Sequence, residues 1–363
     1  MSSISNLALT IVEFVISLGI LAFLHELGHF LIARLFKIEV DEFGFGFPPR
    51  IVRLFRLGGT DFTLNWIPFG AFVRPKGEND PSVPGGLAAS KPWKRLAVLF
   101  GGPVMNLLAG ILIFSLVFVK VGAPDPNVVQ IVGVSPNSPA SVAGIQNGDI
   151  VLTVNGTKVT NSQNLSDMIR QNLGKQVTLS IKRNNQEISL KTTPRVSPPQ
   201  GEGPLGVLLS NPVRQINWFE SIPYATQMTY EQIEQMALLP GRLITGNIPA
   251  DQARVVGPVG MFDIYQQARQ RDTQDQAAQN PQTPAVNTLL LMAFISVALG
   301  ITNLLPIPAL DGGRILFVLP EIVTHRRVQP EFENTVHMIG FALLILLLVV
   351  ITTNDFLHPI ALP

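Results

Sequence analysis

The sequence predicts a polytopic α-helical membrane protein with about four transmembrane helices, a membrane-associated β-region on the cytoplasmic side and an inserted α+β domain. Three observations predict this class. Hydrophobic residues make up 47% of the 363-residue chain, whereas charged residues make up 14%, well below the roughly 25% of soluble domains. Four apolar segments approach or exceed the roughly 20 residues that a spanning helix needs. A long polar segment separates the second from the third.

The apolar segments set the expected division of the chain. They cover residues 7–36, 96–121, 286–305 and 336–351, and a Pro-Ile-Pro break at 306–308 follows the third, before a shorter apolar run to residue 319. We expect a first transmembrane helix (1–36), a cytoplasmic, membrane-associated β-region (37–95), a second transmembrane helix (96–122), a folded outer domain (125–210), an outer amphipathic segment (211–285), a third transmembrane helix (286–319) and a fourth (336–353).

Basic residues orient these helices. Lysine and arginine gather between the first two apolar segments and again, as Arg314, Arg326 and Arg327, between the last two, and none precedes Arg34 or follows Arg327. The positive-inside rule then places both basic segments in the cytoplasm. Both termini and the long segment 120–284 are expected on the outer side of the inner (plasma) membrane. The net charge of +1 gives no reason to expect a nucleic-acid partner.

The residues His25-Glu26-Leu27-Gly28-His29 form an H-E-x-x-H motif inside the first apolar segment. Histidines at i and i+4 lie one turn apart on one helix face, so His25 and His29 can bind one zinc ion, with Glu26 beside them to take a proton from water. A chance match is the alternative, but ionisable residues are costly inside a membrane span and mark functional sites. The motif lies about 14 Å along the helix from residue 36. The sequence therefore predicts a zinc peptidase site within the bilayer, nearer its cytoplasmic face.

Asp311 is the expected third ligand. The chain has no cysteine, so zinc must be bound by His, Asp or Glu, and a catalytic zinc site usually has three protein ligands. Asp311 follows the proline break and precedes two glycines, which together open a helix and permit a close backbone approach. A helix N-cap is the alternative role for this residue. The rival ligands, ranked below it, are His325, His337 and His358.

Asn303 lies shortly before the proline break and is a candidate hydrogen-bond donor to an oxyanion. Its alternative role is helix–helix packing within the membrane.

The segment 37–95 contains patterns typical of short strands with tight turns. Residues 43–47 alternate phenylalanine with glycine, and residues 60–73 alternate apolar with polar side chains. Irregular backbone at membrane depth is tolerated where it is buried or lines a water-filled cavity. We therefore expect a small sheet that dips toward the active site. A cytoplasmic hairpin resting on the lipid headgroups remains the alternative.

The outer domain is expected to alternate strands and helices. Strands are predicted at 128–134, 150–154, 177–181 and 188–190, with hairpin turns at Asn155-Gly156 and Asn184-Asn185. Residues 162–173 have an amphipathic helical pattern. A strand at 205–208 follows a Pro/Gly-rich connection.

Taken together, the H-E-L-G-H motif at 25–29 and the N-L-L-P-I-P-A-L-D-G-G run at 303–313 resemble the site-2 protease family of intramembrane zinc metalloproteases. The arrangement, with one outer domain inserted between the second and third spans, is similar to the bacterial regulator-of-sigma-E protease group. The supporting runs are G-F-G at 44–46, P-F-G-A-F-V at 68–73, G-G-P-V-M-N at 101–106, G-R-L-I-T-G at 241–246 and G-P-V-G at 257–260. Residues 125–210 resemble a permuted PDZ domain, and the chain has room for one where the best-known members have two.

The resemblance implies a role for each matching residue. His25, His29 and Asp311 would bind Zn²⁺, Glu26 would be the general base, and Asn303 would hold the substrate backbone or oxyanion. The substrate would lie as an extended strand beside Gly44, Phe45, Gly46 and Phe47. Leu205, Gly206 and Val207 would line a peptide groove of the PDZ-like domain, which would dock substrates or filter them by size.

The resemblance also implies regulated intramembrane proteolysis. The substrates would be single-span proteins of the lipid bilayer, such as anti-sigma factors or signal-peptide remnants, first cut by an upstream site-1 type protease. Two other function classes are alternatives. An inactive PDZ-containing adaptor would not need Glu26, and a metal transporter would be expected to show internal repeats and more spans.

Overall fold

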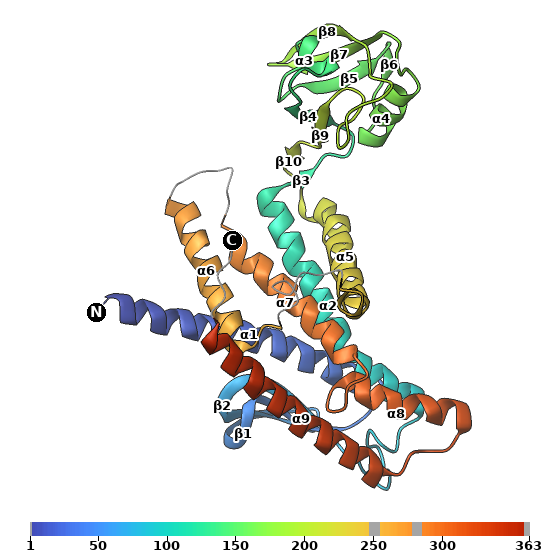
Figure 1. Ribbon diagram of the computed structural model, residues 1–363. Helices are drawn as coiled ribbons and strands as arrows, with labels where there is room; N and C mark the ends of the chain where they lie inside the picture. Colours follow the sequence, from blue (N-terminus) through green and yellow to red (C-terminus); the bar gives the residue numbers. More distant parts are fainter. Residues whose placement is uncertain (1, 247–254, 278–284, 359–363) are drawn as a thin grey trace. The chain divides into compact units, whose positions relative to one another are not determined.

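A computed structural model describes residues 2–246, 255–277 and 285–358 of the chain (Figure 1). The chain forms two compact units. Unit 1 contains Met1–Val121 and Trp218–Pro363, and unit 2 contains Gly122–Asn217. Each unit is described by itself.

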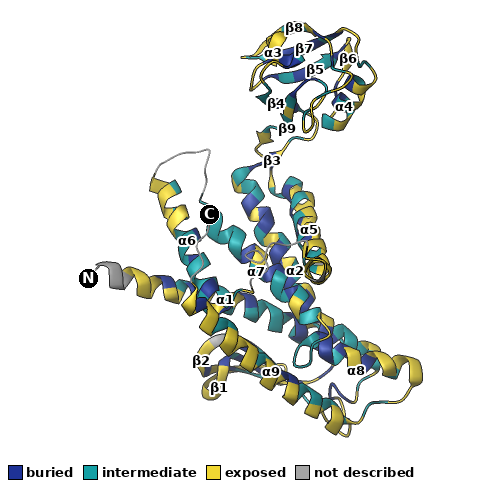
Figure 2. Cartoon of the chain, viewed as in Figure 1, coloured by how far each residue is buried: buried dark blue, intermediate teal, exposed yellow. Residues whose placement is uncertain are grey.

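Within the described residues, four helices of unit 1 are long and apolar enough to cross a membrane. They are α1 (Ser2–Leu35), α2 (Pro92–Val121), α7 (Asn287–Leu304) and α9 (Pro330–Leu357). Their outward faces carry exposed leucine, isoleucine, valine and phenylalanine, and in α9 Gly340 and Asp355 are the buried residues (Figure 2). Exposed apolar surface of this extent is typical of lipid contact. The spans expected from the sequence thus all contain a helix of sufficient length and hydropathy.

Helix α2 packs against both α1 and α7, and glycines permit the contacts. A Cβ atom built on Gly28 of α1 would lie 2.1 Å from the carbonyl oxygen of Gly101 in α2. A Cβ on Gly300 of α7 would lie 2.9 Å from the carbonyl oxygen of Pro103. Small residues let membrane helices approach until their backbones touch.

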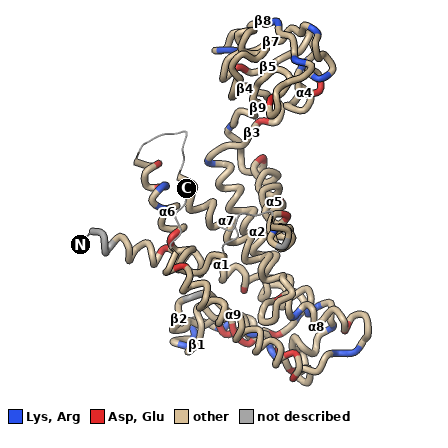
Figure 3. Tube along the Cα trace, viewed as in Figure 1, with Lys and Arg blue, Asp and Glu red and all other residues tan. Residues whose placement is uncertain are grey.

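The segment expected as the β-region forms one long antiparallel hairpin, β1 (Val40–Leu57) and β2 (Thr60–Pro75). Its inner half lies beside α1, where the fully buried Phe43 contacts Phe23 and Phe30. Its outer half exposes apolar and arginine side chains. Figure 3 shows charged residues gathered around this hairpin and α8 (Asp311–Thr324), and few along α2 and α7.

The segment 286–319, expected as one transmembrane helix, contains two helices. Helix α7 ends at Leu304 and α8 begins at Asp311, because Pro306 and Pro308 cannot donate helical hydrogen bonds between them. Residues 305–310 form a tight loop held from α9, where Nδ1 of His337 accepts a hydrogen bond of 2.8 Å from the Ala309 amide. Gly312 and Gly313 pack against the carbonyls of Leu305 and Ile307. The break therefore starts a new helix at Asp311.

The segment 211–285 contains α5 (Trp218–Ile244) and α6 (Pro258–Ala277), with residues 247–254 and 278–284 outside the described part. Both helices pack against the spans. Ala225 of α5 is buried beside Phe114 and Ala293, and Tyr265 of α6 packs on Phe14 of α1. These helices therefore contribute to the core of unit 1.

Unit 2 is an α+β domain. Its sheet has the order β8-β7-β5-β4-β9, with β6 pairing with β5. The strands are β4 (Val129–Val134), β5 (Ile150–Val154), β6 (Thr157–Lys158), β7 (Val177–Arg183), β8 (Gln186–Thr192) and β9 (Val207–Ser210). The helices are α3 (Pro139–Val142) and α4 (Ser162–Arg170), and β3 (Ala123–Pro124) pairs with β10 (Val213–Arg214) where the chain enters and leaves.

The core of unit 2 lies between this sheet and α4, and it includes Leu165, Leu179 and Ile181. Asp149 is fully buried and accepts two hydrogen bonds of 2.7 Å from Arg183. Burial acts to raise the pKa of Asp149, but the hydrogen bonds from Arg183 and from the Gln146 amide lower this pKa below its usual value overall.

Candidate metal centre

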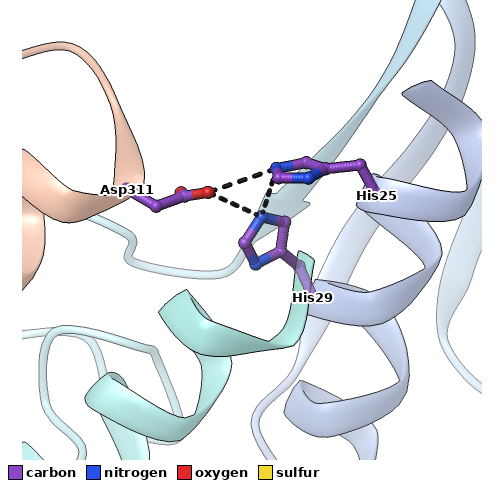
Figure 4. Close-up of side chains that lie close together, drawn as sticks. All are labelled: His25, His29 and Asp311. Carbon is purple, nitrogen blue, oxygen red and sulfur yellow. Dashed lines mark hydrogen bonds and ion pairs between the residues drawn. The ribbon is translucent and has the colours of Figure 1, made fainter. Parts of the chain in front are cut away.

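His25, His29 and Asp311 converge on one point (Figure 4). The Nε2 atoms of the two histidines lie 3.1 Å apart, and Oδ2 of Asp311 lies 3.2 Å from His25 Nε2 and 3.4 Å from His29 Nε2. A tetrahedral zinc ion with bonds of about 2.0–2.1 Å separates its ligand atoms by roughly 3.3 Å. Three atoms at this spacing, from two imidazoles and a carboxylate, fit a zinc ion with a fourth position open for water or substrate.

Two features of the fold bring these side chains together. The histidines lie one turn apart on α1, and Asp311 opens α8 after the proline break. Gly102 of α2 lies beside the histidine rings, and a Cβ built on it would be 2.4 Å from His29 Nε2 and 2.7 Å from His25 Nε2. A glycine at this position leaves room for the metal-binding atoms.

Each histidine ring is oriented through its other nitrogen. Nδ1 of His29 lies 2.7 Å from the carbonyl oxygen of Val98, and Nδ1 of His25 lies 3.2 Å from the side-chain amide of Asn106. A histidine that binds metal through Nε2 carries its hydrogen on Nδ1 and needs an acceptor there. Asn106 is buried, and its Oδ1 has no hydrogen-bond partner among the described residues. The O and N positions of an amide side chain are assigned from the surrounding hydrogen-bond network. If the Asn106 amide is turned so that Oδ1 faces His25, Oδ1 accepts the hydrogen on His25 Nδ1.

Glu26 points toward the hairpin and is absent from the group of metal-ligating atoms that the structure brings together. Its Oε2 accepts a hydrogen bond of 2.9 Å from the backbone amide of Val73 in β2. Glu26 lines the same cavity as His25 and Asp311. It can therefore exchange a proton with a water molecule in that cavity without binding the metal.

Two cavities meet at the site and share His25, Glu26 and Asn303. The first has a volume of about 250 Å³ and contains the metal-ligating side chains, together with the Glu78–Arg314 ion pair. The second has a volume of about 430 Å³ and runs along α1. Asn303 lies in the last turn of α7, where its Nδ2 donates to the carbonyl oxygen of Leu299 at 3.0 Å.

Of the hairpin residues expected at the site, one lines a cavity and the other three do not. Phe47 lines the larger cavity, whereas Phe45 stacks on Phe23 at 5.5 Å between ring centroids. Gly44 packs against Phe72, and Gly46 lies against the carbonyl of Ile67. Of residues 44–47, Phe47 alone lines either cavity. The other strand contributes five residues that we did not predict there: Gly70, Ala71, Phe72, Val73 and Pro75.

The rival histidines lie apart from the group of three ligands. His325 caps the C-terminus of α8, and His358 follows the end of α9. His337 is bound to the Ala309 amide. Among the described residues, His25, His29 and Asp311 form the group whose atoms are close enough together to hold one metal ion.

In unit 2, a pocket of about 140 Å³ lies between α4 and β9. Leu205 and Val207 line it, as expected, together with Leu165 and Ile169 of α4. Gly206 has φ +71°, and its amide donates to the Gly203 carbonyl at 2.9 Å, so it shapes the turn that leads into β9.

Known proteins are similar to this chain over most of its length. The model of the family described as peptidase family M50 matches residues 13–347. A Clostridium acetobutylicum protein whose name assigns it provisionally to the zinc metalloproteases is 30% identical over 96% of this chain and 98% of its own. The regulator of sigma-W protease RasP of Bacillus subtilis is 27% identical, and the zinc metalloprotease RasP of Bacillus licheniformis is 28% identical, each over 95% of this chain and 98% of its own.

Among solved structures, the PDZ domain of an SdrC-like protein from Listeria monocytogenes is similar to part of the chain. The identity is 19%, the TM-score is 0.21, and the match covers 24% of this chain and 92% of that one.

We expect Gly102→Ala to remove most of the bound zinc, because the added methyl group would displace the Nε2 atoms of both histidines. The zinc content of the purified, detergent-solubilised protein measures this. Leu108→Ala, on an exposed position of the same helix, is the control and should retain zinc. Wild-type zinc content in Gly102→Ala would show that the ligands do not need this space.

We expect Asn106→Ala to weaken zinc binding by about 10- to 100-fold, the usual effect of removing a residue that orients a metal-bound histidine. Competition with a chelator measures the dissociation constant. Asn106→Asp keeps an acceptor for the His25 Nδ1 hydrogen and should bind zinc more tightly than Asn106→Ala. Equal affinity of Asn106→Ala and the wild type would exclude a role for the amide in orienting His25.

Proposed function

The chain belongs to peptidase family M50 and is a zinc metalloprotease, and we propose that it cleaves single-span membrane proteins within or near their membrane segment. The observation that carries the proposal is the position of the metal centre. Two ligands lie on α1, a helix long and apolar enough to span the membrane, and the third begins α8 after the break that ends a second such helix. A peptide bond cleaved there would come from a substrate segment at membrane depth.

The residues of the site have complementary roles in this proposal. His25, His29 and Asp311 hold the zinc ion, which supplies Lewis-acid chemistry when bound. Glu26 accepts the proton of the attacking water and passes it to the leaving amine. The Val73 amide fixes the carboxylate of Glu26 for this exchange. Asn303, at the junction of the two cavities, donates its amide to the substrate carbonyl or oxyanion.

We propose that the substrate lies as an extended strand along the side of the hairpin that faces these cavities. A helical peptide bond is shielded by its neighbours, so a membrane segment must unwind before water can attack it. Pairing with a strand replaces the backbone hydrogen bonds that unwinding removes. Phe47 and Gly70–Val73 are the hairpin residues that support this placement, because they line the cavities.

We expect Glu26→Gln to keep its zinc and to lower cleavage of a membrane substrate by about 10²- to 10⁴-fold, because a proton-transfer group is lost while the ligands remain. Cleavage in detergent and zinc content are measured on one preparation. Glu39→Gln, at an exposed glutamate paired with Lys76, is the matched control and should retain activity. Near wild-type cleavage by Glu26→Gln would remove Glu26 from the mechanism.

The proposal also states on which side of the membrane each segment lies. Basic residues between α1 and α2 and between α8 and α9 support a cytoplasmic position for these segments and an outer position for unit 2. The C-terminal residues 359–363, expected on the outer side, lie outside the described part.

We expect reporters at positions 80 and 330 to be cytoplasmic and one at position 185 to be external. Protease protection or thiol labelling of cells measures this. A cytoplasmic reporter at 185 would reverse the orientation and contradict a preceding cut on the outer side by a site-1 type protease.

We propose anti-sigma factors and signal-peptide remnants as the substrate classes. The name of the Bacillus subtilis relative, a regulator of sigma-W protease, supports the first of these.

The pocket of unit 2 supports docking of an extended peptide between α4 and β9, with a size filter as the competing role. Replacing residues 125–212 by a flexible linker distinguishes the docking role from the size-filter role. Docking predicts slower cleavage of a substrate already trimmed on the outer side, because its new end loses its binding site. A filter instead predicts new cleavage of the untrimmed substrate. If neither rate changes, both roles are wrong.

A further inference from the structure

The larger cavity is continuous with the metal centre but extends well beyond it. At one end it is lined by His25, Glu26, Asn106 and Asn303, and from there it follows α1 toward its N-terminus. Ala22, Gly19 and Val15 lie on one helix face, at intervals of three and four residues from Glu26. Val15 is eleven positions from Glu26, so the cavity follows α1 for about 16 Å.

The lining changes from polar to apolar along this path. Beyond the metal centre the walls are Leu18 of α1, Ile295 and Leu299 of α7, Met261 of α6, and Phe47 with Gly70 and Ala71 of the hairpin. The volume of about 430 Å³ falls within the range of about 300–1,000 Å³ that is usual for binding pockets. A pocket that joins a proton-transfer group to an apolar chamber suits a substrate whose backbone lies at the polar end and whose side chain enters the apolar end.

Gly19 keeps this chamber open. A Cβ built on it has no described atom within 4 Å, whereas Cβ atoms on Gly28, Gly102 and Gly300 would collide with neighbouring atoms. Glycine in the middle of a helix is less stable than alanine. No close approach to a neighbour accounts for glycine at position 19. Its structural effect is the free volume that a side chain would occupy.

Helix α6, which contributes Met261 to the chamber, is held by contacts with α1 and α9. Met261 lies in the first turns of α6, and Arg269 of the same helix forms an ion pair with Glu13 of α1. The start of α6 is held from α9, where Oδ2 of Asp355 accepts hydrogen bonds of 2.9 Å from the amides of Gly257 and Gly260. The wall that Met261 forms is therefore anchored to both α1 and α9.

We propose that this chamber is the specificity subsite for one large apolar side chain, of leucine or phenylalanine size, next to the scissile bond. Gly19 and Met261 line the chamber, and the size of the side chain at each position limits what it can hold. The inference rests on the proposed cleavage of membrane proteins, and it adds that residue size at one position selects the substrate.

The test uses the full-length, zinc-loaded protein in detergent and one membrane substrate whose cleaved bond is mapped by mass spectrometry. Each residue beside that bond is changed in turn to alanine, leucine or phenylalanine, and kcat/KM is measured for every variant. The wild type should prefer leucine or phenylalanine at one of the two positions.

Gly19→Leu narrows the chamber and should lower kcat/KM for the large residues by at least about 10-fold relative to alanine, the scale on which apolar pockets discriminate by size. Met261→Ala deepens the chamber and should shift preference toward phenylalanine. Ile20→Phe enlarges the side chain at the neighbouring exposed position and should leave the preference unchanged. Zinc content checks that the metal centre is intact in each variant.

An unchanged preference in both Gly19→Leu and Met261→Ala would overturn the subsite, as would an equal loss on every substrate. If Gly19→Leu does not fold, the shift expected for Met261→Ala decides the question. A zinc-loaded wild type that cleaves no membrane substrate would refute the proposed function, and the subsite with it. A wild type that cleaves without preference would refute the subsite alone.

Discussion

The contact between α1 and α2 at Gly28, Gly101 and Gly102 is the constraint on which the site depends. The Gly28–Gly101 contact brings the two backbones together, so the histidine rings of α1 lie against α2 rather than against lipid. Because of that placement, α2 contributes three features to the metal centre. Gly102 leaves space for the metal-binding atoms, the Val98 carbonyl accepts from His29, and Asn106 lies beside the free nitrogen of His25. A larger residue at the crossing would separate all of these groups together.

A second constraint delivers the remaining ligand. Asp311 is 286 positions from His25 and reaches it because the chain stops being helical after Leu304. The loop that follows is compact for defined reasons. Ala309 has a left-handed φ of +77°, which costs energy for a residue with a side chain, and the hydrogen bond from its amide to His337 helps hold it there. Gly340 of α9 packs directly on Pro308. Helix α9 thus supports the metal centre without contributing a ligand.

The parts of this structure that depend on local sequence were predictable, and those that depend on distant backbone were not. The spacing of His25 and His29 defines a helix face, and the prolines before Asp311 indicate a break, so the three residues that the structure brings together could be named. The hairpin turns of unit 2 were likewise predictable, because Asn155, Asn184 and Asn185 tolerate positive φ. The Val98 carbonyl and the Val73 amide have no sequence signal, since every residue has such groups and only the tertiary fold selects one. The same applies to the hairpin, where alternation predicted strands but not which strand faces the cavities.

The hydrogen bond between Glu26 and the Val73 amide joins the proposed proton acceptor to the hairpin backbone. A carboxylate in an apolar setting is costly unless donors surround it, so withdrawal of β2 would leave Glu26 poorly solvated. Linkage works in both directions: whatever holds β2 in place also holds the Glu26 carboxylate, and a fixed carboxylate helps to hold β2 in place. The position of β2 and the position of the Glu26 carboxylate are therefore energetically coupled. An incoming polypeptide that stabilises the docked strand would also fix the carboxylate that we propose as the proton acceptor.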